Sequence, residues 1–544
     1  MENQHHWRQK THLYREALLV FFFTLIIFTA GLGNHEFVIF DTRFALFAQE
    51  MLRNGLSFFP TAFGQPYPDY PATSTILIYL CSLPWGHVTK FSGVLPSAIA
   101  TSLTLSFMYL TAAPLSRRWG ICAVLFALFT VGYVATARSI ALDQYTTLVT
   151  MLSFYFAYSA HLHHKKTKWW CFPLLFLFGF ACRGPIGIVI PASVVGSYYL
   201  MQTDWSGMLK IAGMALVTLI IGMALLAWAA YAQGGADFLH EVLGMQIFTR
   251  LSDSKAGDPF YYYFVNSFGT YAIAYPIAVF TCIGLLPKIR KLELDHPLKL
   301  IQLLTVWTLV IIIGMSIPHD KKPRYILAIV PAISLISGYL FVEKFPSMWI
   351  KLTRKTIAWL CFIFPIVGAI LTQIAKSELE QRGIHLSIDF TSVIIMLCAL
   401  QALAVILCLF YRSSRSRELI ALAIAVMVFV AINIVIVEPT LLNLTQSRRF
   451  VRQVDMLRDR YPGDLIFYRA DKDALIMRYV VNSREDLKPI KDIKTESELA
   501  NLKPPVYVIM EQEEFEKLAP NVASQFRVII QGQIGRDTAV TLEK

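Results

Sequence analysis

Two aspartates, Asp41 and Asp143, stand at the edges of apolar segments, where a carboxylate can take up a proton or orient a bound group. Asp41 follows an apolar run that ends near Gly33, which places it where lipid gives way to water. Asp143 opens a later apolar segment, and the helix dipole favours a carboxylate in a first turn. The pair could hold a metal ion, deprotonate a hydroxyl, or bind hydroxyls and an amine. Helix capping is the alternative explanation of Asp143.

A second set of candidate residues is basic. It lies in the segment from Pro318 to Tyr325 and in the break Arg183-Gly184-Pro185-Ile186-Gly187 between two apolar runs. A phosphate at the membrane surface is the anion that fits these cations best. Attraction to anionic lipid head groups is the alternative for the first segment, and a simple helix break is the alternative for the second. The cations of the first segment are Lys321, Lys322 and Arg324, with Tyr325 beside them.

Arg138 precedes Asp143 by five residues. At this spacing we expect the two side chains to meet across the loop. Such an ion pair would keep the Asp143 carboxylate ionised.

The stretch that contains Asp41 continues with apolar residues at helical spacing and with polar residues between them, as in a helix that lies along the membrane surface. Its apolar positions are Phe44, Phe47, Ala48, Met51 and Leu52, and its polar positions are Arg43, Gln49, Glu50 and Arg53. A plain anchoring helix has the same pattern.

An aromatic run, Pro259-Phe260-Tyr261-Tyr262-Tyr263-Phe264, follows a polar segment. An interfacial aromatic belt is the default interpretation. Tyrosines are also suitable walls for a polyprenyl chain or for the face of a sugar. The preceding polar residues are Arg250, Asp253, Lys255 and Asp258.

Composition excludes an ordinary soluble protein, because 56% of the 544 residues are hydrophobic and only 16% are charged. About 20 apolar residues are needed to cross a bilayer. On that rule the sequence predicts a polytopic α-helical membrane protein with about thirteen spans. They start near residues 17, 94, 119, 143, 169, 185, 208, 268, 300, 324, 355, 388 and 418.

Basic residues predict the orientation of these spans, because Lys and Arg are enriched in loops on the cytoplasmic side. The amino terminus and alternate loops, such as the one with Lys165, Lys166 and Lys168, carry this excess. All the candidate clusters then fall on the opposite side. Ionisable groups at the edge of spans are costly unless they are paired or hydrated, so we expect one shared outer cavity.

The formal charge of +12 does not indicate a nucleic-acid partner. From Glu438 onward basic and acidic residues balance, so the excess belongs to the membrane part, where topology explains it. The pattern also changes there to short β-rich runs, at 464–468, 505–510 and 526–530, with a helical stretch at 511–518. We predict a membrane domain over residues 1–440 and a small soluble α/β domain over 441–544, on the outer side.

Four motifs together resemble the GT-C membrane glycosyltransferases, the superfamily of aminoarabinose transferases and protein mannosyltransferases that use lipid-phosphate sugar donors. Their order and predicted outer placement agree with that superfamily over residues 1–440. In chain order the motifs are Asp41-Thr42-Arg43-Phe44-Ala45, Arg138 with Asp143, Arg183-Gly184-Pro185-Ile186-Gly187, and Lys322-Pro323-Arg324-Tyr325-Ile326-Leu327.

The resemblance implies a GT-C-like fold with interfacial helices and implies roles for single residues. Asp41 would be the main catalytic or acceptor-orienting carboxylate and Asp143 its partner. The basic residues would clamp the donor phosphate, whose charge grows as it leaves. The expected substrate-binding residues are Arg43, Tyr67, Asp69, Tyr70, Arg138, Arg183, Tyr262, Lys321, Lys322, Arg324 and Tyr325.

The chain also departs from the pattern of this superfamily. An aromatic-acid-Lys-Pro-Pro motif reads Pro68-Asp69-Tyr70-Pro71-Ala72 here, so Tyr70 stands in place of a phosphate-binding lysine. Thr42 replaces an acid that often follows the first Asp. Asp258 stands near the position where some members carry a histidine, which weakens the case for a metal. No cofactor is required by these residues, and a divalent cation stays an open alternative.

The resulting functional hypothesis is an inverting glycosyltransferase in a bacterial inner membrane, with its active site and carboxyl-terminal domain in the periplasm. It would move a sugar from a polyprenyl phosphate to lipid A or another envelope acceptor. One alternative is a protein O-mannosyltransferase, and another is a transporter or flippase of lipid-linked sugars. Expected partners are the lipid donor, a lipid A, glycan or protein acceptor, and membrane lipids.

Overall fold

Helices make up most of the chain, as its apolar runs predict. The computed structural model describes all residues except 1, 39, 246–257, 290–294, 320, 345, 382–388, 412, 446, 471–474, 484–489 and 536. The predictions for Arg250, Asp253 and Lys255 therefore lie outside the described residues.

Seven of the described helices are long and apolar enough to cross a membrane, or up to nine if each of two bent pairs counts as one span. The chain is thus a multi-pass membrane protein. Each of the thirteen predicted segments contains a helix, but several of these helices are short. Thirteen crossings therefore stay a prediction.

The chain forms two compact units. Unit 1 comprises Met1–Ala30, Pro68–Ser74 and Pro96–Val435, and unit 2 comprises Gly31–Tyr67, Thr75–Leu95 and Ile436–Lys544. Residues of the first predicted outer loop thus belong to the same unit as the carboxyl-terminal region, whereas the prediction drew a single boundary at 440/441.

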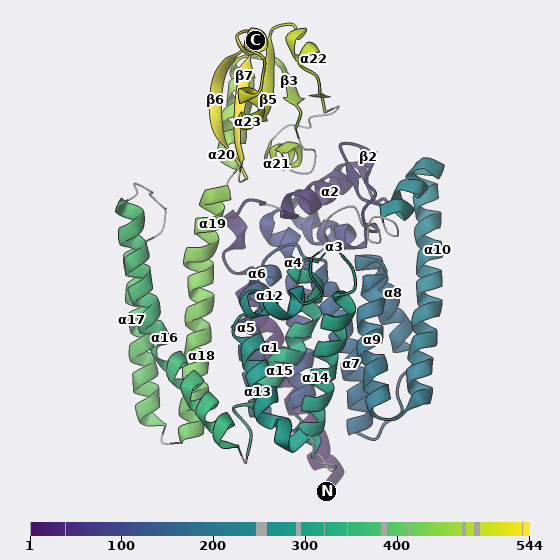
Figure 1. Ribbon diagram of the computed structural model, residues 1–544, viewed down its shortest axis with the longest axis vertical. Coiled ribbons are helices and arrows are strands. Elements are labelled where there is room, and N and C mark those ends of the chain that lie inside the picture. Colours follow the sequence, from purple (N-terminus) through teal and green to yellow (C-terminus); the bar gives the residue numbers. More distant parts are fainter. Residues whose placement is uncertain are drawn as a thin grey trace. The chain divides into compact units, whose positions relative to one another are not determined.

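Unit 1 is a helical bundle (Figure 1). In chain order its helices are α1 (Glu2–Thr29), most of α4 (Lys90–Ala112), α5 (Arg117–Leu128), α6 (Val131–Ala137), α7 (Asp143–Leu162), α8 (Cys171–Arg183), α9 (Ile186–Met201), α10 (Trp205–Leu243), α12 (Tyr262–Thr270), α13 (Ala274–Ile289), α14 (His296–Met315), η4 (Pro323–Ile329), α15 (Val330–Tyr339), α16 (Met348–Gln381), α17 (Phe390–Phe410) and α18 (Ser414–Ile432).

The core of unit 1 surrounds α15, all of whose ten residues are buried. Two buried tryptophans hold it in place by side-chain hydrogen bonds. Trp119 of α5 donates to the carbonyl of Leu335 at 2.7 Å, and Trp307 of α14 donates to the carbonyl of Ala328 at 3.0 Å. A buried indole N–H needs such a partner, so these bonds fix the position of α15 and of η4 before it.

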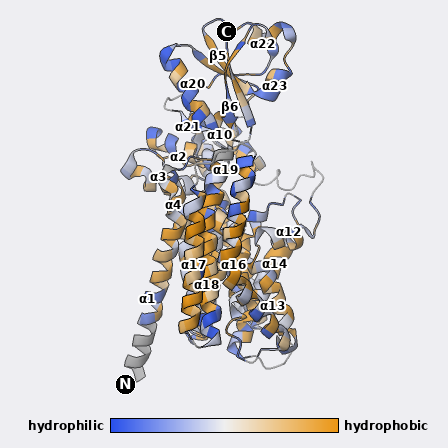
Figure 2. Cartoon of the chain, turned by 90° about the vertical axis from the view of Figure 1, so that its left-hand side faces the viewer, coloured by the Kyte–Doolittle hydropathy of each residue, from blue (hydrophilic) through white to orange (hydrophobic). Residues whose placement is uncertain are grey.

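Helices α16, α17 and α18 pack against one another within unit 1 (Figure 1). Their outer surfaces are strongly apolar (Figure 2), and most of α17 is exposed. Apolar surface of this extent on helices of spanning length is what contact with lipid tails requires.

Helices α8 and α9 approach so closely that only glycine fits between them. A Cβ atom on Gly187 would lie 2.0 Å from the carbonyl oxygen of Gly179, and one on Gly179 would lie 2.2 Å from that of Gly187. Small residues allow such close helix contacts in membranes. The chain turns at Gly184, whose φ is 65°. The predicted break is therefore confirmed, with Arg183 as the last residue of α8.

The soluble part of unit 2 is built on a five-stranded sheet in the order β4-β3-β5-β7-β6. Strand β3 is parallel to β4 and β5, whereas β7 is antiparallel to β5 and β6. The strands are β3 (Asp464–Tyr468), β4 (Asp492–Ile493), β5 (Val506–Glu511), β6 (Arg527–Ile534) and β7 (Asp537–Glu543). The three predicted strands match β3, β5 and β6.

Alternating side chains of the strands build one core on each face of the sheet. Phe467 and Ile509 pack with α20 (Arg448–Arg460) and α21 (Met477–Asn482), and their neighbours Ile466 and Val508 pack on the other face with α22 (Glu496–Ala500) and α24 (Pro520–Ala523). Successive side chains of a strand point to opposite faces of the sheet, so a sheet covered on both faces has apolar residues at consecutive positions. The small α/β domain is confirmed. Its predicted helix is the short α23 (Gln512–Glu516).

Unit 2 also contains the residues around Asp41. They form η1 (Leu32–Asn34), α2 (Phe40–Asn54), the short strands β1 (Thr61–Ala62) and β2 (Gln65–Pro66), most of α3 (Thr73–Ser82), η2 (Leu83–Trp85) and the start of α4. Helix α2 packs on α21. Glu36 accepts hydrogen bonds from the N–H groups of Ser447 and Arg448 at 3.0 Å each, at the start of α20. The carboxyl-terminal domain thereby supports the segment that carries Asp41.

We expect Gly187→Ala to destabilise the α8–α9 pair by about 1–3 kcal/mol, because the added methyl group meets backbone that cannot yield without separating the helices. Gly196→Ala on the same helix is the matched control, since its Cβ has no atom within 4 Å. The control should be neutral or slightly stabilising. Thermal unfolding of the detergent-solubilised protein measures both, and equal melting temperatures would contradict the close contact.

Candidate active site

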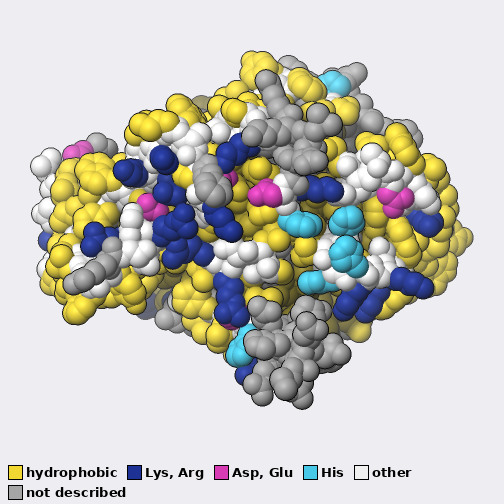
Figure 3. All heavy atoms as spheres, turned by 90° about the horizontal axis from the view of Figure 1, so that it is seen from below, with side chains coloured by type: hydrophobic (Ala, Val, Ile, Leu, Met, Phe, Trp, Pro, Cys, Tyr) yellow, Lys and Arg dark blue, Asp and Glu magenta, His cyan; other side chains and the backbone are white. Residues whose placement is uncertain are grey.

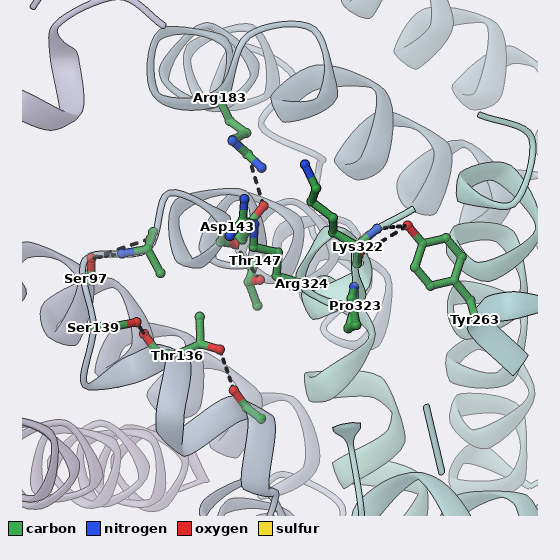
Figure 4. Close-up of polar contacts among 12 residues, drawn as sticks. Ser97, Thr136, Ser139, Asp143, Thr147, Arg183, Tyr263, Lys322, Pro323 and Arg324 are labelled. Carbon is green, nitrogen blue, oxygen red and sulfur yellow. Dashed lines mark hydrogen bonds and ion pairs between the residues drawn. The ribbon is translucent and has the colours of Figure 1, made fainter. Parts of the chain in front are cut away.

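Asp143 is the first residue of α7, and two arginines hold its carboxylate. Arg183 donates from Nε to one oxygen at 3.0 Å, and Nε of Arg324 lies 3.8 Å from the other (Figure 4). Asp143 and Arg183 are buried, whereas the Arg324 side chain is 34% exposed. A buried charge is stable only when it is paired, so α7, the end of α8 and η4 are joined through this carboxylate.

The predicted Arg138–Asp143 pair is wrong. The guanidinium of Arg138 donates instead to the carbonyls of Ile27 and Ala30, at 2.6 and 2.7 Å, at the end of α1. These carbonyls have no partner within the helix, and a cation is favoured at a helix carboxyl terminus. Arg138 is in this way a cap of α1, while Arg183 takes the expected place beside Asp143.

Three cations gather around the ring of Tyr325. The guanidinium carbons of Arg183 and Arg324 lie 5.5 and 5.9 Å from its centroid, and Nζ of Lys322 lies 5.9 Å away. Arg183 also lies 4.9 Å from the ring of Tyr70. Aromatic faces attract cations, so these rings partly offset the repulsion among the like charges.

The segment that carries Lys322 and Arg324 is fixed by two tyrosines of another part of unit 1. Tyr263 of α12 bonds through its hydroxyl to the backbone N–H of Lys322 at 3.2 Å and to its carbonyl at 3.3 Å. The hydroxyl of Tyr271 donates to the carbonyl of Pro323 at 2.7 Å. The backbone of this segment is thereby held while the Lys322 amine extends away from it (Figure 4).

Lys321 differs from its neighbour because its amine is buried and donates to the carbonyl of Asp258 at 2.8 Å. This contact joins the segment before η4 to the segment before α12. Tyr262, the first residue of α12, makes an edge-to-face ring contact with Tyr263 at 5.3 Å.

The start of α7 is also held by α4. Oγ of Ser97 accepts from the N–H of Ala141 at 3.2 Å, and the Thr147 hydroxyl donates to the carbonyl of Asp143 at 2.8 Å (Figure 4). Asp69 is buried and adds negative charge near Arg183. Unit 1 therefore brings together Asp143, Arg183, Arg324, Tyr325, Lys322, Tyr70 and Asp69 from the predicted set.

Asp41 lies in unit 2, near the start of α2, and its buried carboxylate forms an ion pair with the amine of Lys90. Lys90 is itself buried and is the first residue of α4. Sequence reasoning missed Lys90. The signal was present, since a lysine at the edge of an apolar run is as costly there as the aspartates that were singled out.

Helix α2 is confirmed, but its predicted polar face is not. Glu50 is buried and accepts hydrogen bonds from the Thr61 hydroxyl at 2.8 Å and from the N–H of Gly64 at 3.1 Å. It thereby fixes the β1–β2 turn beside α2. Arg43 lies 5.8 Å from the ring of Tyr67, which in turn contacts Phe47.

Asp41 and Asp143 belong to different units, so their convergence in one pocket stays a prediction. No group of three His, Cys, Asp or Glu side chains with the geometry of a metal site occurs among the described residues. A divalent cation likewise stays a prediction.

Known proteins resemble this chain in sequence and in fold. The family model "Dolichyl-phosphate-mannose-protein mannosyltransferase" matches residues 71–231. An undecaprenyl phosphate-alpha-4-amino-4-deoxy-L-arabinose arabinosyl transferase of Pseudomonas aeruginosa is 27% identical over 345 residues, which cover 60% of each chain. A homologue from Yersinia enterocolitica with the same name is 26% identical over 341 residues. The chain thus matches about three fifths of the length of these relatives.

The fold comparison covers nearly the whole molecule. The crystal structure of ArnT from Cupriavidus metallidurans bound to undecaprenyl phosphate has a TM-score of 0.67 and 14% identity, over 96% of this chain and 97% of that one. Its apo state gives a TM-score of 0.68. In sequence this chain is similar to aminoarabinose transferases and, over 71–231, to protein mannosyltransferases, and its fold is that of the GT-C membrane glycosyltransferases. The family match at 71–231 spans Asp143 and Arg183, and the GT-C fold extends over both units.

The Asp41–Lys90 pair makes a direct prediction for stability. We expect Lys90→Met to destabilise the protein by about 3–5 kcal/mol, because it breaks a buried ion pair by removing one partner. Asp41→Leu/Lys90→Met removes both charges and should recover most of that loss.

Lys491→Met is the control, since Lys491 and Asp464 form an exposed pair in the same unit at 2.6 Å. Such pairs contribute about 0–1 kcal/mol. Thermal unfolding in detergent compares the variants. A double variant that is less stable than Lys90→Met would show that the two charges do not depend on each other.

Proposed function

We propose that this protein is an inverting glycosyltransferase that moves a sugar from a polyprenyl-phosphate donor to lipid A or another envelope acceptor. The observation that carries the proposal is the gathering of Arg183, Lys322 and Arg324 around Tyr325 at the ends of apolar helices. Asp143 and Asp69 offset part of this positive charge, and the cationic charge in excess of them favours a bound anion. A phosphate on a lipid carrier has the charge and the membrane location that this cluster fits.

The reaction requires a leaving group whose negative charge increases as the bond to the sugar breaks. The lipid phosphate is that group, and Arg183, Lys322 and Arg324 stabilise its charge. Asp143 orients Arg183 and Arg324 through its two oxygens and so fixes the geometry of the clamp. Arg43, Tyr67, Asp69, Tyr70 and Tyr262 complete the proposed substrate-binding set.

Asp41 is proposed to orient or deprotonate the acceptor group that attacks the sugar. Its ion pair with Lys90 holds it in one orientation, and its buried position strengthens its attraction for a cation or a hydroxyl of a substrate. An inverting transfer needs the acceptor oxygen on the face of the sugar opposite the leaving phosphate. We therefore assign Asp41 to the acceptor side and the Tyr325 cluster to the donor side.

Names of relatives support the substrate class. The Pseudomonas and Yersinia proteins are named as arabinosyl transferases that use an undecaprenyl-phosphate sugar, and the Cupriavidus structure contains undecaprenyl phosphate. The family match at 71–231 favours protein O-mannosylation as a second candidate. For both, the proposed location is a bacterial inner membrane, with the active site and residues 441–544 facing the periplasm.

Asp41→Ala should lower the transfer rate at least about 100-fold, the smaller end of what a positioned acid or base contributes. Asp41→Ala also breaks the buried pair with Lys90, so Asp41→Leu/Lys90→Met, which removes both charges, is the control for a structural role: its melting temperature should recover while transfer stays lost. Asp464→Ala, at an exposed position of the same unit, should change neither. The assay supplies donor only to the outer face of sealed vesicles. Activity there without an energy source argues against an obligatory transporter, whereas full activity of Asp41→Ala would remove Asp41 from the site.

Asp41→Asn separates the two acceptor classes. A Ser or Thr hydroxyl needs a general base, so the wild-type rate would fall at low pH and the variant would lose that fall. A phosphate acceptor is already ionised, and the residual rate of Asp41→Asn should then follow the wild-type pH profile. Mass spectrometry of lipid A and glycolipids from cells with and without the protein identifies the acceptor.

Loss of charge at Lys322, as Lys322→Gln, should weaken donor binding about tenfold or more, because an interaction with a charged group contributes about 1.5–3 kcal/mol. Lys321 is left unchanged, since its buried amine holds the segment. Lys351→Gln removes the same charge from an exposed position of α16 outside this cluster and should leave donor binding within twofold. Titration with polyprenyl phosphate measures both, and equal effects would contradict the clamp.

A further inference from the structure

A second basic site lies in unit 1, away from the Tyr325 cluster, at the opposite end of α7. A cavity of about 250 Å³ opens there between α1, the end of α4, the end of α7 and the loop from α7 to α8. Three lysines of that loop line it, Lys165, Lys166 and Lys168, together with His163. Figure 3 shows Lys, Arg and His side chains gathered on this face. Among the described residues that line it, none is an Asp or Glu.

The loop that carries the lysines has a fixed backbone. Helix α7 ends with His164 in the left-handed region, at a φ of 50°. The N–H of Lys165 donates to the carbonyl of Ala160 at 2.8 Å, and the N–H of His164 donates to that of His161 at 3.1 Å. This pair of bonds is a Schellman motif, which reverses the chain over the end of the helix. The lysines are therefore held beside the cavity by the backbone.

The electrostatics of the loop favour an anion. The N–H of Cys171, which begins α8, donates to the carbonyl of Lys168 at 3.1 Å, so the lysines directly precede a helix amino terminus. The positive end of the helix dipole adds to their charge. The carboxylate of Glu16 on α1 is already engaged by the Tyr109 hydroxyl at 2.5 Å and by Arg117 at 3.4 Å.

The rest of the cavity is suited to a lipid. Its walls include Leu13, Leu110 and Phe156, while Tyr14 and Ser159 supply hydroxyls next to the basic end. Trp170, beside the loop, is 65% exposed. Exposed tryptophans mark the depth of the head groups in a bilayer, and basic pockets between membrane helices bind anionic head groups.

We propose that this cavity binds the head group of an anionic glycerophospholipid from the surrounding leaflet. Lys165, Lys166 and Lys168 hold the phosphate, the hydroxyls of Tyr14 and Ser159 bond to the glycerol part, and an acyl chain lies along the apolar wall. The chemistry of the ligand is thus a phosphodiester joined to a hydrocarbon chain. The site is separate from the proposed sugar-transfer site and does not depend on it.

The test uses the full-length protein in detergent, with lipid binding measured by native mass spectrometry. Lys165→Gln/Lys166→Gln/Lys168→Gln should weaken the binding of phosphatidylglycerol at least tenfold. The control Lys299→Gln/Lys351→Gln/Lys355→Gln removes three other exposed charges of unit 1 and should change binding less than twofold. Equal losses in the two triple variants would overturn the proposal. Ser159→Phe, which fills the cavity without a change in charge, should also weaken binding, and full binding by this variant would overturn it.

Three further ligands identify the source of the phosphate. Phosphatidylethanolamine, which has no net charge, should bind at least tenfold more weakly than phosphatidylglycerol. Glycerol 3-phosphate should not displace the lipid, because it lacks the hydrocarbon chain. Displacement by glycerol 3-phosphate at equal concentration would indicate a soluble anion instead, and a preference for undecaprenyl phosphate would indicate a second site for the carrier lipid. Either result would overturn the proposal.

Discussion

Ionised side chains at the ends of apolar helices must be paired, and this constraint organises both units of the protein. In unit 2 the carboxylate of Asp41 and the amine of Lys90 are both buried and bind each other. In unit 1 Asp143 lies between Arg183 and Arg324. A single buried charge would cost several kcal/mol, so each pair determines where the helices that supply it must end.

In unit 1, particular residues determine where α8 ends and where α7 and η4 begin. Glycine at 179 and 187 lets α8 and α9 touch, and the left-handed turn at Gly184 stops α8 at Arg183. Ser97 holds the start of α7, and Tyr263 with Tyr271 holds the segment that begins η4. Three chain segments that are far apart in sequence thus present charged side chains to one another. Their backbones are fixed by local contacts, so little conformational entropy remains to be lost when a ligand binds.

Sequence alone predicted the elements better than the contacts between them. The break at Arg183 and the strands β3, β5 and β6 follow from local signals, namely Gly-Pro and short β-rich runs. Strands β4 and β7 carry weaker signals and were missed. The cation nearest to Asp143 in sequence, Arg138, caps α1, while the true partner Arg183 comes from another helix. The partners of Glu50 and the pairing of Lys90 with Asp41 could not be predicted for the same reason, because contacts between distant parts of the chain do not follow from the spacing of residues in sequence.

Lys321 and Lys322 are neighbours in sequence but have different roles, because the amine of Lys321 is buried and that of Lys322 lies beside the Tyr325 ring. The Lys321 amine is buried and satisfied by a carbonyl, so its charge stabilises the junction between the segments before α12 and η4. Lys322 uses its backbone for that junction and leaves its amine beside the ring of Tyr325. The ring can stabilise a cation by about 0.5–2 kcal/mol, less than a charged phosphate oxygen would. An arriving phosphate can therefore compete for Lys322 and Arg324 without disturbing the backbone that Lys321 secures.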